Sequence, residues 1–138
     1  MDVSLVTIAD KARNTLSLKI GDVEVDLLRH AYPILETGDV IQGISLISLP
    51  DLAAMKLNEV ANRGSKKDFY DVVELLEHFS IREMVGFFTK KYVTSDPFSV
   101  IRSLAWFEEA ELEPDPFSRN GLTWDDVQER VKTAVASL

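Results

Sequence analysis

Charged side chains that could bind metal ions and phosphates gather between residues 26 and 71 of this sequence. The candidates are Asp26, Lys56, Arg63, Lys67, Asp68 and Asp71. Carboxylates are ligands for Mg²⁺, and Lys and Arg side chains bind phosphate oxygens. Enzymes that transfer nucleotides combine these two kinds of group in one site. The elements that carry these residues decide whether such a site can form.

Asp26 lies in the run VEVDLL, residues 23–28, which is predicted as a β-strand. Because side chains alternate between the two faces of a strand, Glu24 and Asp26 share a face with Leu28. Asp26 could therefore be a metal ligand or a general base on the face of a sheet. It could also be an acid of an edge strand that only faces water. The pattern leaves both interpretations open.

Lys56 lies in a predicted helix, one turn after Leu52 and one turn before Val60, so it belongs to an apolar stripe. In one interpretation the stem of the lysine packs on this stripe while its ammonium group reaches water. In the other, the ammonium group reaches a phosphate in a cleft. The spacing alone does not decide between them.

Charges of both signs concentrate where this helix should meet the next one. Lys67 and Asp71 are four residues apart, as in a surface salt bridge. Asp68 falls in the first turn of the second helix, where an acid interacts favourably with the helix dipole. These local explanations do not say why Arg63 and three further charges meet at one helix–helix junction.

The order of the predicted elements defines the fold class. Strands are expected at residues 4–8, 16–20, 23–28 and 41–47, with a hairpin turn at Gly21-Asp22. Helices are expected at residues 48–63, 65–79 and 81–92, from Asp96-Pro97 onward, and from Thr123 onward. A small β-sheet followed by a helical bundle makes an α+β protein. We expect a single domain over residues 1–138, with a β-rich part at 1–47 and a helical part at 48–138.

Composition and charge narrow the function classes. The 138 residues carry a net charge of −8 and no cysteine, which excludes disulfides and thiolate metal sites. The negative charge disfavours non-specific nucleic-acid binding, although Arg63, Lys66 and Lys67 could form a local basic site. Lys90 and Lys91 are expected to be solvated surface residues. With no apolar run as long as a membrane span and no signal sequence after Met1, we expect a cytoplasmic protein.

Other chemistries have little support in the sequence. His30 and His78 lack metal-ligand spacing to each other, and no serine-hydrolase elbow, Walker loop or dinucleotide fingerprint occurs. The large aromatic residues of the second half are expected in the core or pinning loops, not as a base-stacking platform. They are Trp106, Phe107, Phe117 and Trp124.

The predicted helical pair resembles a known family. The run DLAAMKLNEVANRGSKKDFYDVVELLEHFS, residues 51–80, is similar to the lysine-bearing helix and the following Arg-x-x-x-Lys-Asp-x-x-Asp helix of the AbiEii/AbiGii-type nucleotidyltransferase toxins. VEVDLLRHAYPIL, residues 23–35, resembles the third-carboxylate strand of that family. RSLAWFEEAELEPDPF, residues 102–117, and the Trp-led final helix resemble its C-terminal region. The similarity covers nearly the whole chain from about Leu16 onward.

The resemblance implies a polymerase-β-like nucleotidyltransferase fold, present here as a remnant of its sheet followed by helices. Members of the family resemble enzymes that use Mg²⁺ to transfer a nucleotidyl group, in characterised cases onto tRNA. They often act as the toxin of a toxin–antitoxin or phage-defence pair. By this resemblance the catalytic residues would be Asp26, Lys56 and Asp68, with Asp26 as the third carboxylate, a metal ligand or base. The nucleotide-binding residues would be Lys56, which holds the triphosphate, with Arg63 and Lys67, while Arg63 and Asp71 order the junction.

The sequence also departs from the family pattern. Family members carry, ahead of these strands, a Gly-Ser loop and helix, then a strand with two carboxylates one residue apart. Residues 1–8 leave no room for these parts, and Glu24-Val25-Asp26 copies the carboxylate spacing without a preceding Gly-Ser helix. One carboxylate cannot organise a two-metal site, so the chain alone is expected to be inactive.

Two functions therefore stay open. The chain could be the C-terminal portion of a split or truncated nucleotidyltransferase, with a nucleoside triphosphate and tRNA as partners once a missing half is supplied. It could instead be an inactive binding module of a toxin–antitoxin or defence complex, with an antitoxin protein as partner. In either case a partial sheet exposes an edge and apolar surface, so we also expect a homo-oligomer. A metal-dependent nuclease built on Glu24, Asp26 and Asp68 has no motif behind it.

Overall fold

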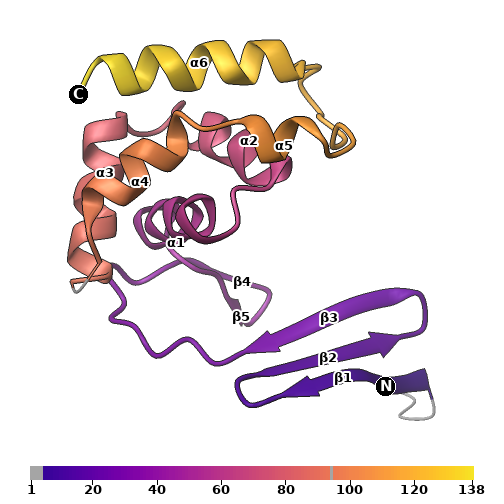
Figure 1. Ribbon diagram of the computed structural model, residues 1–138. Helices are drawn as coiled ribbons and strands as arrows, with labels where there is room; N and C mark the ends of the chain where they lie inside the picture. The colour runs from indigo at the N-terminus through magenta and orange to yellow at the C-terminus, as the bar shows by residue number, and fades with distance from the viewer. Residues whose placement is uncertain (1–4, 94) are drawn as a thin grey trace. The chain divides into compact units, whose positions relative to one another are not determined.

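The chain is an α+β protein, as the sequence predicts. The computed structural model describes residues 5–93 and 95–138. It divides into two compact units, Met1–Tyr32 and Pro33–Leu138. The first unit holds a three-stranded sheet, and the second holds a two-stranded hairpin and the helices (Figure 1). The division between units thus falls before the hairpin, whereas the sequence analysis separates a β-rich part from a helical part after residue 47.

The first unit is an antiparallel sheet in the order β1-β2-β3. Its strands are β1 (Val6–Ala12), β2 (Thr15–Ile20) and β3 (Val23–Leu28). The predicted hairpin turn is present, with Gly21 at a φ of +59° that favours glycine. The first strand was expected at 4–8 and extends further, to Ala12, while residue 4 lies outside the described residues. No described residue of this unit is buried, so the sheet forms no core of its own.

A tight hairpin opens the second unit. The single strand expected at residues 41–47 is wrong: the structure has two short strands, β4 (Val40–Ile41) and β5 (Ile44–Ser45). The chain reverses at Gln42 and Gly43, whose φ values of 51° and 78° are those of a primed two-residue turn. A Cβ on Gly38 would lie 1.9 Å from the carbonyl oxygen of Leu46, so only glycine allows this close approach.

The described residues after the hairpin form six helices, and most of the predicted helix starts are confirmed. They are α1 (Leu49–Asn62), α2 (Lys66–Leu75), α3 (Ile81–Lys91), α4 (Pro97–Leu104), α5 (Glu108–Glu111) and α6 (Trp124–Ala136). The second helix ends at Leu75 instead of continuing to 79, and the four-residue α5 was not expected. Among the described residues, no helix combines the length and the apolarity needed to cross a membrane.

Local hydrogen bonds explain where these helices begin. The side chain of Ser48 accepts from the backbone N–H of Asp51 at 3.1 Å. Complete capping boxes, in which side chain and backbone bond reciprocally, start α3 at Ser80 and α6 at Thr123. Gly64, with a φ of +61°, follows the end of α1 as the predicted stop signal.

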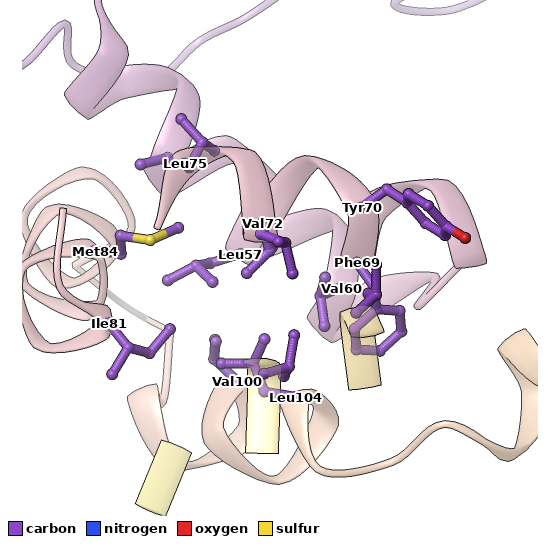
Figure 2. Close-up of a cluster of buried hydrophobic side chains, with 14 of the residues drawn as sticks. Leu57, Val60, Phe69, Tyr70, Val72, Leu75, Ile81, Met84, Val100 and Leu104 are labelled. Atoms are coloured by element: carbon purple, nitrogen blue, oxygen red, sulfur yellow. The ribbon is translucent and has the colours of Figure 1, made fainter. Parts of the chain in front are cut away.

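The core of the second unit surrounds α1. This helix packs against α2, α3 and α4, and α6 packs against α2 and α4. Figure 2 shows side chains of these helices converging, among them Leu57 of α1, Val72 of α2 and Val100 of α4. Phe107 and Trp124 join this core, as expected. Trp106 and Phe117 do not, because they are 56% and 90% exposed, and the expectation that they lie in the core or pin loops is wrong.

A buried ion pair fastens the segment before the hairpin to the helices. The Nζ of Lys91 lies 2.6 Å from Oδ1 of Asp51, and both side chains are almost completely buried. Lys91 also donates to the carbonyl oxygen of Pro33 at 2.8 Å, and Asp51 accepts from the backbone N–H of Leu35 at 2.9 Å. The sequence-based expectation of a solvated Lys91 is therefore wrong. Its ammonium group compensates a carboxylate of another helix, which makes burial of both charges tolerable.

Burial by itself raises the pKa of Asp51. Hydrogen bonds from Lys91, from Ser48 and from two backbone N–H groups outweigh this effect and hold the pKa far below its usual range. The side chain is therefore a carboxylate in the folded protein, and its stabilising contacts depend on the lysine.

Replacing Lys91 by methionine should destabilise the protein by about 3–5 kcal/mol, because it leaves the carboxylate of Asp51 buried without its cation. The free energy of unfolding is measured by urea denaturation followed by circular dichroism. The matched control is Lys90→Met, at an exposed neighbour, which should change stability by less than about 0.5 kcal/mol. Adding Asp51→Asn to Lys91→Met should recover part of the loss. A loss under about 1 kcal/mol in Lys91→Met would contradict the assigned role of the pair.

Candidate functional site

Asp68 is the centre of the charged cluster at the α1–α2 junction. Its side chain has no exposed surface. Arg63, at the C-terminal end of α1, donates to it with two groups, Nε at 3.1 Å to Oδ2 and Nη2 at 2.9 Å to Oδ1. The hydroxyl of Ser65, at the start of α2, donates to Oδ2 at 2.5 Å. This paired arginine contact fixes the turn between the two helices.

Lys56 reaches the same carboxylate from one face of α1. Its Nζ lies 2.7 Å from Oδ2 of Asp71 and 3.6 Å from Oδ1 of Asp68. The lysine side chain is 24% exposed and that of Asp71 is 48% exposed, so the ammonium group lies at the surface of the helix pair. Asp71 therefore pairs with Lys56 of the neighbouring helix and not with Lys67 in its own helix.

The electrostatics of Asp68 follow from this arrangement. Burial acts to raise its pKa, but hydrogen bonds from Arg63 and Ser65, and the charges of Arg63 and Lys56, hold the pKa below its usual value. The hydrogen bond to Asp68 in turn raises the pKa of Arg63. The site thus holds a buried carboxylate between the side chains of Arg63 and Lys56.

A hollow opens beside the ammonium group of Lys56. It has a volume of about 370 Å³, and we call it the Lys56 hollow. The lining residues are Leu49, Leu52, Lys56, Asp71, Glu74, Leu75 and His78. A mostly apolar wall with a few charged groups is the usual composition of a small-molecule site. The lysine offers a cation to the occupant, and Asp71 and Glu74 offer acceptors.

The other two lysines of the cluster behave differently. Lys67 is exposed, and none of the hydrogen bonds or ion pairs found among the described residues involves its side chain. Lys66 is only 4% exposed, with its Nζ 3.0 Å from Asp115 Oδ1 and 5.0 Å from the ring centroid of Trp124. Lys66 therefore cannot belong to an exposed basic patch with Arg63 and Lys67, and that expectation is corrected.

Asp26 belongs to the other compact unit. It lies on the edge strand β3, is exposed, and accepts a hydrogen bond from the hydroxyl of Ser17 at 2.6 Å. Within residues 5–93 and 95–138, no group of three or more metal-ligating side chains could hold a metal ion. Asp26 thus offers a single carboxylate, with a serine hydroxyl as its recorded partner.

The sequence patterns predict the charged residues of the junction but not all of their neighbours. Ser65 donates to Asp68 and His78 lines the Lys56 hollow, and neither was predicted as a site residue. The signal for Ser65 was present, because Ser65-x-x-Asp68 repeats the Ser48-x-x-Asp51 pattern that marks the start of α1. No local pattern pointed to the pairing of Lys56 with Asp71, which depends on how the two helices pack.

The chain is similar over most of its length to an uncharacterized protein. This protein, from Aquifex aeolicus strain VF5, is 30% identical to the chain over 133 residues. The match covers 91% of this chain but 62% of the relative, so the chain spans less than two thirds of the length of the protein that it matches. No model of a known protein family matches the chain, and no solved structure matches it.

Replacing Asp68 by asparagine should lower the free energy of unfolding at neutral pH by about 1–3 kcal/mol, because it removes charge-assisted hydrogen bonds from the junction. The pKa of Asp68 lies below the ordinary value of 3.8. Its contribution is therefore present above that pH and is lost as the pH falls through the lowered pKa. Urea denaturation of both proteins from pH 7 downward should show the difference shrinking below pH 4. Asp125→Asn, at an exposed position of α6, is the control, and a pH-independent difference would contradict the assignment.

Proposed function

We propose that this chain is the C-terminal portion of a nucleotidyltransferase-like protein of the AbiEii/AbiGii type, which works in the cytoplasm. In this proposal the Lys56 hollow receives the phosphates of a nucleoside triphosphate. Nucleotidyl transfer, with tRNA as the acceptor implied by the resemblance, requires a further polypeptide segment. The chain alone binds the nucleotide without transferring it.

The observation that carries this proposal is the position of Lys56. Its ammonium group is held at the mouth of a hollow by Asp71, through an ion pair that is partly open to solvent. Such a pair is weak and can exchange, so a phosphate with more than one negative charge can compete for the lysine. Arg63, fixed on Asp68, keeps the two helices in place while this exchange occurs.

The residues that the structure describes do not gather the carboxylates of a two-metal site. The described residues include no group of three metal ligands, and Asp26 offers one carboxylate, hydrogen-bonded to Ser17. Two-metal nucleotidyl transfer needs several carboxylates at one point. In our proposal the missing segment brings these carboxylates, and Asp26 adds to them as a metal ligand or base. The part of the Aquifex relative that lies outside the match is the first segment to test for this role.

Nuclear magnetic resonance titration of the chain with each of the four nucleoside triphosphates tests the binding step. We expect saturable shifts at residues that line the Lys56 hollow. Lys56→Ala should weaken the binding by about tenfold or more, because it removes the charge that contacts phosphate. Lys90→Ala, at an exposed site of α3, should leave the affinity unchanged.

Equal affinity in Lys56→Ala and the unaltered chain would refute the proposed site. Transfer of a labelled nucleotide to tRNA, with Mg²⁺, is the second measurement. We expect no transfer by the chain alone. Transfer should appear only after addition of the segment of the Aquifex relative that lies outside the match.

A second candidate function is a binding module without catalysis, which a different observation favours. The segment from residue 34 to residue 49 exposes a run of large apolar side chains. These are Ile34, Val40, Ile41, Ile44, Leu46, Ile47 and Leu49. Exposed apolar side chains that gather in one short segment are typical of an interface between proteins. In this alternative the surface binds a second copy of the chain or the antitoxin protein of a defence complex.

Light scattering distinguishes self-association from a monomer. A dimer would have twice the chain mass of 15.5 kDa. Replacing the cross-strand pair Ile41 and Ile44 by glutamate should produce monomers, because it places charges in the apolar contact. Gln42→Glu, which adds a charge to the same hairpin without removing apolar surface, should leave the dimer intact. A monomeric unaltered chain at high concentration would exclude the second copy as the occupant.

A further inference from the structure

A second groove lies at the other end of α1, away from the lining of the Lys56 hollow. It has a volume of about 530 Å³ and is formed by the C-terminal end of α1, by α4 and by the start of α5. We call it the Trp106 groove. The lining includes Asn62, Arg63, Arg102, Ser103, Trp106 and Glu109. None of them lines the Lys56 hollow, and Arg63 is the one among these six to which the resemblance assigns a role.

The charges of the groove have a partial structural explanation. Arg102 is in the last turn of α4, and Arg63 follows the last residue of α1. Cations at these positions interact favourably with the helix dipole. That explanation does not require the two guanidinium groups to line the same groove. It also leaves unexplained why the indole ring of Trp106, which lines the same groove, is 56% exposed.

The hydrogen-bonding capacity of the groove is largely unused. Arg63 donates to Asp68 through Nε and Nη2, so its orientation is fixed while Nη1 makes no hydrogen bond to the described residues. Arg102 is exposed, and its side chain takes part in no ion pair found in the described part of the chain. The amide of Asn62 donates to the carbonyl oxygen of Asn58 at 2.8 Å, which leaves its oxygen as an acceptor.

We propose that the Trp106 groove binds a nucleotide unit, a flat base joined through its sugar to a single phosphate. An exposed indole is a stacking surface for a base, and a guanidinium group binds phosphate oxygens with paired hydrogen bonds. Arg102 and the free Nη1 of Arg63 contact the phosphate, and Trp106 stacks on the base. Glu109 and Asn62 accept hydrogen bonds from amino or hydroxyl groups.

The charge of the groove favours one phosphate over several. Asp68 already compensates Arg63, and the acid Glu109 lines the groove together with Arg102. A triphosphate would therefore meet too little positive charge here, in contrast to a monophosphate or a phosphodiester. The volume is within the range of small-molecule sites and accommodates one nucleotide. The same unit occurs as a free mononucleotide and at the end of a single strand, and the experiment separates these sources.

The two tryptophans of the chain provide the measurement and its internal control. Each indole N–H gives its own resonance; Trp106 lines the groove, while Trp124 is buried in the core. The chain is titrated with adenosine monophosphate, with a short single-stranded oligonucleotide, with adenosine and with inorganic phosphate. We expect a saturable shift of the Trp106 resonance with the first two and little change at Trp124. Adenosine and phosphate should each bind at least about tenfold more weakly, because each lacks one half of the contacts.

Variants assign the binding to named residues. Arg102→Ala and Trp106→Ala should each weaken binding by about tenfold or more, the second followed through backbone resonances of α4. Arg119→Ala removes an exposed arginine outside the groove and should have no effect. Lys56→Ala should also have no effect, so this proposal can succeed or fail independently of the proposed function. Retained dispersion of the Trp124 resonance shows that each variant is folded.

The outcomes are distinct. Tighter binding of the oligonucleotide than of the monophosphate assigns the groove to the end of a strand, and the reverse assigns it to a free nucleotide. An unchanged Trp106 resonance with every ligand would overturn the proposal. Binding that survives unchanged in both Arg102→Ala and Trp106→Ala would overturn it as well.

Discussion

A carboxylate that is completely buried requires cations beside it. In this protein that carboxylate belongs to Asp68, and its requirement for cations organises the helical unit around the candidate site. Burial acts to raise the pKa of this acid, but the contacts of Arg63, Ser65 and Lys56 together hold the pKa below its usual value. Because removal of a single partner from a buried charge is costly, the turn between α1 and α2 has little freedom to change. The position of Lys56 above the hollow follows from that fixed turn, since the lysine contacts both Asp68 and Asp71.

One short sequence pattern is used in two different ways in this fold. A serine or threonine followed three residues later by an acid starts α3 and α6, and there the acid remains at the surface and only caps its own helix. In α1 and α2 the same pattern places Asp51 and Asp68 in the interior. Each of these acids accepts from its own serine and also receives a cation from another helix. The pattern that begins a helix thus also joins two helices where its acid is buried.

This double use marks the limit of what could be predicted from the sequence. Helix starts such as Ser80 and Thr123 were predictable because capping depends on residues within one turn. The burial of Lys91 was not, because its neighbour Lys90 has the same type and is exposed; only the packing of α3 on α1 distinguishes them. The hairpin at Gln42-Gly43 was read as one strand because glutamine rarely adopts a positive φ, and the pair lacks the usual Asn-Gly signal. In the candidate site, the charged residue types were evident, whereas the choice of Lys56 over Lys67 as partner of Asp71 came from tertiary structure.

The shared carboxylate also gives a physical reason for so many charges at one junction. Oδ1 of Asp68 lies 2.9 Å from Arg63, which lines the Trp106 groove, and 3.6 Å from Lys56, which lines the other hollow. Asp68 has no exposed surface, and its carboxylate is compensated from both sides. It is therefore the common counter-ion of two cations that line different hollows, which is why these charges meet at one junction.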